Sequence, residues 1–377
     1  MIYLDNSATT RYKPKSVIDC YYREATNSAN SGRSGHSDAI ALMTKIYKAR
    51  EVIKEYVGAN EDYEVIFTSG ATEGLNIVIQ GYLKGKEGDV ITTMLEHNSV
   101  IRPLHYISQN QNINISYIKP NEIGKVTSDM IREKITSDTK LIVINHTSNV
   151  IGVTQDIASI GIVAREYSIP LLIDTAQSLG HTKINMVSDN ISILVGCGHK
   201  GLQAMQGIGF IVIKKDILLS PIKFGGTGTN SDSLEQPTLY PEGFECGTLN
   251  SPAIVSLIPA IEWLNEHQSQ LERKEKLLSG ELIYGLKQIN HVKLYSSYPS
   301  SVISFNIDSF SSSEIADILS ENNIAVRGGL HCAPLAHKYL NTFDIGTVRA
   351  SIGFNNNMYD IKKLLEVVEN IAKSIKT

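Results

Sequence analysis

The sequence has few cysteines, no excess of basic residues and no long hydrophobic segment. Its four cysteines, Cys20, Cys197, Cys246 and Cys332, are far apart and form no Cys-x-x-Cys pair. The 35 basic residues are outnumbered by 39 acidic ones, giving a net charge of −4 that argues against a nucleic-acid partner. No apolar run approaches the ~18 residues that span a bilayer, and the first residues lack the apolar core of a signal peptide. We therefore expect a cytoplasmic protein with reduced thiols and no membrane partner.

Strands and helices alternate through the first two thirds of the chain. Short apolar runs rich in Ile and Val occupy residues 64–68, 90–95, 141–145, 170–174, 191–197 and 207–213. Most are separated by segments of helical periodicity, which predicts β-α-β crossovers and a mainly parallel sheet. A Gly- and Pro-rich stretch at 224–252 and a long amphipathic helix from about 253 to 289 follow. The rest of the chain is typical of a small α+β domain.

Polar side chains gather where these strands end. They are His97, Asn149, Asp174, Gln177, His199 and Lys200. In parallel sheets ligands bind beyond the carboxyl ends of the strands, so we expect these residues to share one site. Lys200 lies in a glycine-flanked turn, where partial desolvation favours the neutral amine that forms a Schiff base. The alternative is an ordinary solvated loop lysine.

The junction at residues 69–72 (SGAT) is the best candidate for an anion site. It joins a strand to a helix, and helix N-terminal N–H groups with the hydroxyls of Ser69 and Thr72 suit a phosphate. The alternative is an ordinary helix N-terminus capped by a side chain. Such a cap is expected at Ser37, for the helix that runs to about Val57. No Gly-Lys-Ser/Thr follows, so this is not a Walker A loop.

A lysine, a strand-end aspartate and a phosphate-binding helix together describe a pyridoxal 5′-phosphate (PLP) site. Asp174 would keep the pyridine nitrogen protonated, and Asn149 and Gln177 would bind the ring hydroxyl. His97 would lie over the ring and transfer protons, because imidazole titrates near neutral pH. Taken singly, Asp174 is equally explained as a turn residue and His97 as a buried histidine with satisfied hydrogen bonds.

The whole chain resembles the class V aminotransferase-like PLP enzymes, and among them the cysteine desulfurase and selenocysteine lyase family. The matching segments are residues 4–10 (LDNSATT), 69–73 (SGATE), 96–97 (EH), 149–152 (NVIG), 174–177 (DTAQ), 198–200 (GHK), 244–248 (FECGT), 327–332 (RGGLHC) and 349–351 (RAS). The resemblance implies a fold-type I transferase with a mainly parallel, seven-stranded-type sheet. It further implies a large PLP-binding domain at residues 14–257 and a small domain formed by 1–13 and 258–377. The small domain would carry the catalytic cysteine loop.

The resemblance also assigns roles to residues. Catalytic roles fall to Lys200, Cys332 and His97. Cofactor contacts fall to Ala71, Thr72, His97, Asn149, Asp174, Gln177, Cys197, His199, Lys200 and Thr248, and substrate contacts to His36, Asn149, Arg327 and Arg349. Thr248 would reach the phosphate of the other subunit's cofactor, which implies a homodimer. Cys197 stands where the family usually has a serine, and Leu330 where many relatives have a histidine.

The implied reaction converts L-cysteine to L-alanine and leaves a persulfide on Cys332. The short connection from Cys332 to Arg349 resembles the short-catalytic-loop group, whose members often need a sulfur-acceptor protein. Arg327, His331 and His337 would favour the thiolate, whereas the alternative for Cys332 is a buried core thiol. No metal is expected, because His331, Cys332 and His337 do not make a matching ligand set. Selenocysteine lyase, another class V transamination or elimination with Cys332 incidental, and a catalytically silent scaffold remain alternatives.

Overall fold

The larger part of the protein is built on a seven-stranded sheet. The computed structural model describes residues 1–27, 29–30, 35–229 and 231–375. The strand order is β2 (Tyr63–Thr68), β8 (Gly209–Lys214), β7 (Ile193–Cys197), β6 (Leu171–Asp174), β5 (Thr139–Asn145), β3 (Gly88–Thr93) and β4 (Ile113–Ile118). Strand β8 is antiparallel to β2 and β7, and every other pair is parallel. The predicted mainly parallel seven-stranded sheet is confirmed.

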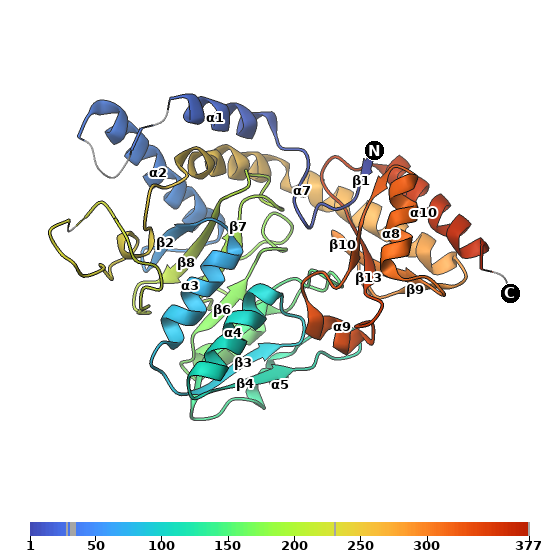
Figure 1. The fold of residues 1–377 in the computed structure, drawn as a ribbon, viewed down its shortest axis with the longest axis horizontal. Helices are drawn as coiled ribbons and strands as arrows, with labels where there is room; N and C mark the ends of the chain where they lie inside the picture. The colour runs from blue at the N-terminus through green and yellow to red at the C-terminus, as the bar shows by residue number, and fades with distance from the viewer. Residues whose placement is uncertain (28, 31–34, 230, 376–377) are drawn as a thin grey trace.

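Helices cover both faces of this sheet, so its strands are buried on both sides (Figure 1). Alternate residues of β5 point to opposite faces: Ile142 and Ile144 join one core cluster, Leu141 and Val143 the other. The first cluster is closed by α1 (Lys15–Thr26), α2 (Ser37–Tyr56), α5 (Ser128–Arg132) and α6 (Ile157–Glu166). The second is closed by α3 (Ala71–Leu83) and α4 (Asn98–Asn110). This arrangement directs the N-termini of α3 and α4 to the carboxyl ends of the parallel strands.

A second unit contains the C-terminal residues and the N-terminus. Its antiparallel sheet has the order β12 (Arg327–Gly329), β13 (Thr347–Ser351), β10 (Val302–Ile307) and β9 (Val292–Leu294). Helices α8 (Ser312–Glu321), α9 (Pro334–Leu340) and α10 (Met358–Lys373) accompany it. Strand β1 (Ile2–Tyr3) pairs in parallel with β11 (Ile324–Ala325), and Leu4 is buried in this unit's core. The chain therefore starts in the small unit and crosses to the large one.

Helix α7 (Ser251–Gln288) joins the two units. Its first part, from Ala253 to Leu264, belongs to the core of the large unit, and Leu278 to Leu286 belong to that of the small unit. Two separate cores share this helix, and the core of the large unit continues along it to Leu264; the division into residues 14–257 and residues 1–13 with 258–377 stays a prediction. The loop before α7 contains the short helix η1 (Glu242–Phe244). Within the described residues, every helix is too short or too polar to cross a membrane.

Candidate active site

A cavity of about 280 Å³ lies at the carboxyl ends of β5, β6 and β7 and at the N-termini of α3 and α4. Nine predicted site residues line it, namely Ala71, Thr72, His97, Asn149, Asp174, Gln177, Cys197, His199 and Lys200. Ser99 and Asn145, which the sequence did not point to, line it as well. The structure thus brings together side chains from five separate segments of the chain.

The N-terminus of α3 faces this cavity without a side-chain cap. Gly70 occupies the N-cap position, and no side chain in the described part of the chain accepts a hydrogen bond from the first turn. Thr72 Oγ1 is 2.8 Å from Ser99 Oγ, which ties the first turns of α3 and α4 together. Free N–H groups at the positive end of a helix dipole form an anion site.

Asp174 ends β6 and is 4% exposed. The N–H of Ala176 donates to its Oδ1 at 2.9 Å, and burial raises the pKa of the carboxyl group against the opposing effects of that bond and of the Lys200 charge. A buried carboxylate with so little compensation gains from a cationic partner. Lys200, which follows β7, lines the same cavity.

The N-terminal segment holds the turn that carries Lys200. The carbonyl oxygen of His199 accepts hydrogen bonds from the N–H of Thr10 and from Nζ of Lys13, each at 3.0 Å. Partial burial lowers the pKa of Lys13 to about 8. The side chain of Gln177 donates through Nε2 to the carbonyl of Ser7 at 3.1 Å. The role of residues 7–13 was missed because nothing in their local sequence indicates what they contact.

His97 is a neutral base in this environment. Burial, reinforced by the charges of Lys200, Arg327 and Arg349, lowers its pKa to about 4. The expectation that it titrates near neutral pH is therefore wrong. The N–H of Ser99 donates to Nδ1 at 3.1 Å, as expected for an N-cap side chain, so the neutral ring carries its proton on Nε2.

Cys332 lies outside this cavity but next to it. It lines an open groove of about 550 Å³, which shares Thr72, His97 and Ser99 with the cavity and continues between α3 and α4. Nη2 of Arg327 contacts its sulfur at 3.7 Å. His331 and Cys332 are both left-handed, with φ of 48° and 56°, a strained conformation for residues other than glycine.

The two histidines near Cys332 are neutral. Burial lowers the pKa of His331 to about 2 and that of His337 to about 4. The prediction that they help to stabilise a thiolate is therefore wrong, and Arg327 is the cation that contacts the sulfur. Their Nε2 and Nδ1 atoms instead bond to Thr347 and Thr342, respectively, which fixes the loop.

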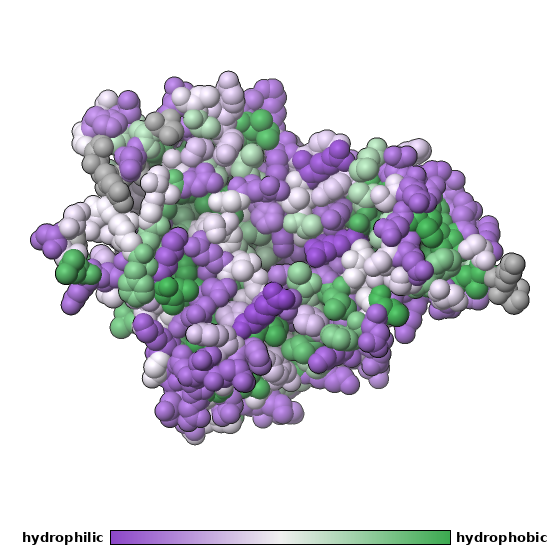
Figure 2. Space-filling model, viewed as in Figure 1, coloured by the Kyte–Doolittle hydropathy of each residue, from purple (hydrophilic) through white to green (hydrophobic). Residues whose placement is uncertain are grey.

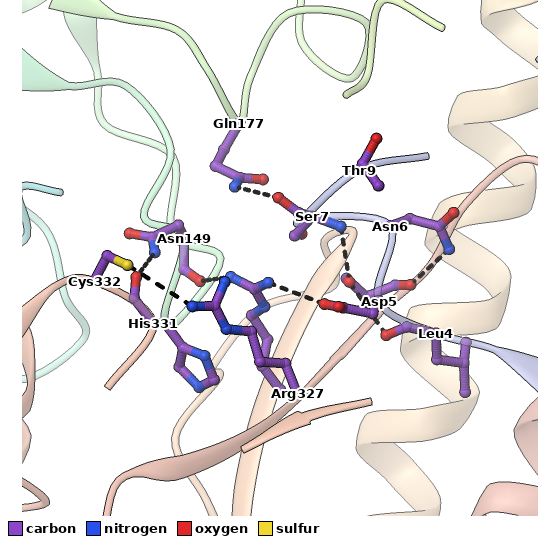
Figure 3. A network of polar contacts seen from close by, with 12 residues as sticks. Leu4, Asp5, Asn6, Ser7, Thr9, Asn149, Gln177, Arg327, His331 and Cys332 are labelled. Carbon is purple, nitrogen blue, oxygen red and sulfur yellow. Dashed lines mark hydrogen bonds and ion pairs between the residues drawn. The ribbon is translucent and has the colours of Figure 1, made fainter. Parts of the chain in front are cut away.

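Arg349 lines neither the cavity nor the groove, but Asn149, which lines the cavity, contacts both this arginine and the loop that carries Cys332 (Figure 3). Arg349 is 1% exposed, and its Nη1 donates to the carbonyl of Asn149 at 3.1 Å. The side chain of Asn149 donates to the carbonyl of His331 at 2.6 Å. Asn149 therefore links the cavity wall, the buried guanidinium and the Cys332 loop.

Two predicted residues lie elsewhere in the chain. His36 is exposed and caps α2, accepting a 3.3 Å hydrogen bond from the N–H of Ala39, although the sequence predicted Ser37 as the cap. Thr248 lines another cavity, beside the buried ion pair of Arg50 and Glu245. Neither borders the cavity or the groove, so their site roles stay predictions, and that of Thr248 requires a second subunit.

Comparison with known proteins places this geometry in a family. The Aminotransferase class-V family matches residues 2–364, so the chain belongs to that family. The chain is 32% identical over 397 residues to a probable cysteine desulfurase of Borreliella burgdorferi, covering 100% of this chain and 92% of the relative. It is 30% identical to the cysteine desulfurase of Wigglesworthia glossinidia brevipalpis, with coverages of 100% and 94%. The family expected from the motifs is confirmed.

Solved structures agree with the sequence relatives. The cysteine desulfurase of Thermococcus onnurineus NA1 superposes with a TM-score of 0.91 at 28% identity, covering 99% of this chain and 95% of that one. The cysteine desulfurase CsdA of Escherichia coli gives a TM-score of 0.88 at 26% identity, with coverages of 98% and 94%.

Proposed function

We propose that the chain is a PLP-dependent L-cysteine desulfurase that forms a persulfide on Cys332. The observation that carries this proposal is the position of Cys332. It lies in a groove that adjoins the cavity lined by Lys200 and Asp174, and the guanidinium of Arg327 contacts its sulfur. The cysteine desulfurases at about 30% identity over nearly the full length support it.

The lining of the cavity fits PLP. Asp174 would pair with the pyridine nitrogen, the free first turn of α3 with the phosphate, and Lys200 with the aldehyde carbon. Oδ1 of Asn149 and Nδ1 of His199 are buried atoms without a partner among the described residues, which suits contacts with a polar ligand. When bound, PLP supplies the electron sink that makes bonds to the substrate's α and β carbons labile.

The protein's own groups would divide the remaining work. His97, neutral with its proton on Nε2, would donate a hydrogen bond into the cavity and exchange a proton there. Lys200 would move the proton of the substrate's α carbon. Arg349 would bind the substrate carboxylate, and Arg327 would orient the thiolate of Cys332.

The sulfur-transfer step belongs to Cys332. Its thiolate would attack the sulfur of the substrate, forming an S–S bond while the C–S bond breaks and its electron pair stays with the carbon skeleton. Protonation of that carbon gives alanine. The outer sulfur of the persulfide then leaves when an acceptor thiolate attacks it.

The groove supports a protein as sulfur acceptor. It is lined by Asn76 and Gln80 of α3 and by Arg102 and Tyr106 of α4, and it runs from Cys332 to the surface. Hydrophilic side chains dominate the neighbouring surface around β4 and α5 in Figure 2. A groove of this size, with both apolar and polar parts in its lining, suits an extended loop carrying a cysteine.

A homodimer and a cytoplasmic location complete the proposal. Ile40, Met43 and Tyr47 form an exposed apolar stripe on α2, and two of them border the cavity that contains Thr248. A second copy covering this stripe would bring Thr248 toward the partner's site. All four cysteines are free thiols, which supports a reducing compartment. Light scattering of the purified protein tests the dimer, and a monomeric mass would contradict it.

The decisive experiment measures alanine formed from L-cysteine in the presence of a thiol reductant. We expect activity in the wild type, none in Lys200→Ala, and loss of alanine in Cys332→Ala with the cofactor's visible absorbance retained. Full activity of Cys332→Ala would contradict the persulfide. L-Selenocysteine, assayed in parallel, distinguishes a selenocysteine lyase, which would release alanine from that substrate alone. A yellow protein that makes alanine from neither substrate would indicate another class V reaction.

A further inference from the structure

The carboxylate of Asp5, which has no role in the reaction proposed above, contacts Arg349. Its Oδ1 lies 3.2 Å from Nη2 of Arg349, although 344 residues separate them in the sequence. Nη1 of the same guanidinium donates to the carbonyl of Asn149, which lines the cavity. The two terminal nitrogens are therefore fixed from opposite sides, one by the cavity wall and one by Asp5.

The backbone around Asp5 is fastened to the strand that carries Arg349. Asp5 forms an isolated parallel bridge with Ser351 of β13. Ser7 donates its N–H to the hydroxyl of Ser351 at 2.9 Å, and the side chain of Asn6 donates to the carbonyl of Ser351 at 3.0 Å (Figure 3). The carboxylate of Asp5 thus has little freedom to leave Arg349.

The local charges leave room for one more anion. Arg349 is paired with the carboxylate of Asp5, and the positive charge of Arg327 opposes that of Arg349. Nε of Arg349 is buried and has no partner among the described residues. A substrate carboxylate therefore adds to this cluster and neutralises it, while Asp5 stays in place.

We propose, building on the proposed function, that Asp5 is a positioning residue for the substrate carboxylate. It holds the Arg349 guanidinium in the orientation that leaves its remaining N–H donors for the substrate. Without Asp5, Arg349 would be a buried, poorly compensated cation free to turn toward other acceptors. The site would then lose its preference for a free carboxylate over an ester.

The test compares L-cysteine with L-cysteine methyl ester in the holoenzyme. Asp5→Asn should raise KM for L-cysteine at least tenfold and leave kcat within about threefold, because the thiol and the cofactor contacts are unchanged. KM for the ester should stay within about threefold, because the ester presents no carboxylate to Arg349. An equal rise for both substrates, or no rise for either, would overturn the proposal.

Matched variants separate positioning from folding. Asn6→Ala removes one tie to β13 but leaves the Asp5–Ser351 bridge and the Ser7 bond, so it should lower stability and change the acid-to-ester ratio of KM much less than Asp5→Asn does. Asp5→Glu keeps the charge but displaces it, so its ratio should lie between wild type and Asp5→Asn. If Asp5→Asn does not fold, the ratio in Asp5→Glu decides: a wild-type ratio there overturns the proposal.

A second readout does not depend on turnover. L-Alanine and L-alaninamide, titrated against the cofactor's absorbance, report binding with and without a carboxylate. Asp5→Asn should weaken the response to alanine alone, even if the wild type proves inactive on cysteine. If the wild type made no alanine from cysteine but Asp5→Asn still bound L-alanine more weakly and L-alaninamide as before, the proposed function would be refuted and the role of Asp5 would stand.

Discussion

The backbone N–H of Asn98 donates a 2.7 Å hydrogen bond to the carbonyl oxygen of Cys332. Asn98 begins α4, so the N-terminus of a helix in the large unit fixes the peptide that carries the thiol. The side chain of Asn149 fixes the preceding carbonyl, that of His331. The ring of His331 reaches the other way, to Thr347 in the small unit. The position of Cys332 therefore depends on contacts with both units.

His331→Ala should loosen this loop. The ring is 2% exposed, and Nε2 lies 2.9 Å from the carbonyl of Thr347 and 3.1 Å from its hydroxyl. We expect destabilisation of about 2–4 kcal/mol and a kcat lowered at least about tenfold, measured by urea unfolding and steady-state kinetics. Thr347→Val, which loses only the hydroxyl, is the control and should cost about 1 kcal/mol.

The pH dependence of this variant checks the interpretation. Because the pKa of His331 is about 2, its ring stays neutral in any usable buffer. The ratio of wild-type to variant kcat should therefore be constant between about pH 6 and 9. A ratio that changes across this range would mean that His331 titrates during the reaction.

Arg327→Gln should make Cys332 less reactive. Its guanidinium is the cation in contact with the sulfur, at 3.7 Å. Removing this charge should slow alkylation by iodoacetamide at pH 7 by roughly 3- to 10-fold, followed at the Cys332 peptide by mass spectrometry. Arg102→Gln, an exposed arginine in the same groove, is the matched control. Equal slowing in both variants would point to a general field in the groove rather than to this contact.

The sheet was predictable because its strands have a simple composition. The central residues of β5 and β6, 141–144 and 171–173, are all apolar, as burial on both faces requires. Helix α4 was not predicted, because Pro103 lies within it, although Val100, Leu104 and Ile107 are apolar residues at helical spacing.

The site was predictable where residue type and strand end coincide, as for Asp174 and Lys200. The Asp5–Arg349 contact was not, because its partners are brought together only by the parallel bridge between the chain's two ends. The protonation of His97 and His331 also depends on burial, which a local sequence does not reveal. Long-range packing therefore decides the electrostatics of the site.

Glu96→Gln should remove a pH-dependent loss of stability. Glu96 is 0% exposed, and its Oε1 accepts hydrogen bonds from Thr93 Oγ1 and Asn145 N at 2.7 and 2.9 Å. Burial raises its pKa to about 8 from 4.5, so the folded state keeps a proton that the unfolded state has lost. The free energy of unfolding should fall as pH rises from 4.5 to 8, by up to about 1.4 kcal/mol per unit.

The glutamine variant imitates the protonated acid and should lack this slope. Urea unfolding of wild type and Glu96→Gln between pH 5 and 9 measures the difference, which should level off above pH 8. Glu61→Gln, at an exposed position, is the control for a change of charge alone. If Glu96→Gln and the wild type had equal slopes, Glu96 would be ionised in the folded protein.

Cys197→Ser should strengthen cofactor binding. Cys197 ends β7 in the wall of the cavity, 3% exposed, and its sulfur lies 3.9 Å from the carbonyl of Ala176. Burial raises the pKa of the thiol, so it is a neutral and weak hydrogen-bond donor. A serine hydroxyl makes a shorter and stronger bond to a phosphate oxygen, so Kd for PLP should fall roughly 3- to 10-fold.

Titration of the apoprotein with PLP, followed by intrinsic fluorescence, gives Kd for the wild type, Cys197→Ser and Cys197→Ala. Alanine removes the sulfur without adding a donor, so it separates the gain of a hydrogen bond from the loss of a thiol. If the serine variant binds PLP no more tightly than the alanine variant, this position does not contact the phosphate. The phosphate would then have to lie wholly against the first turn of α3, and the assignment of Cys197 to the phosphate site would be wrong.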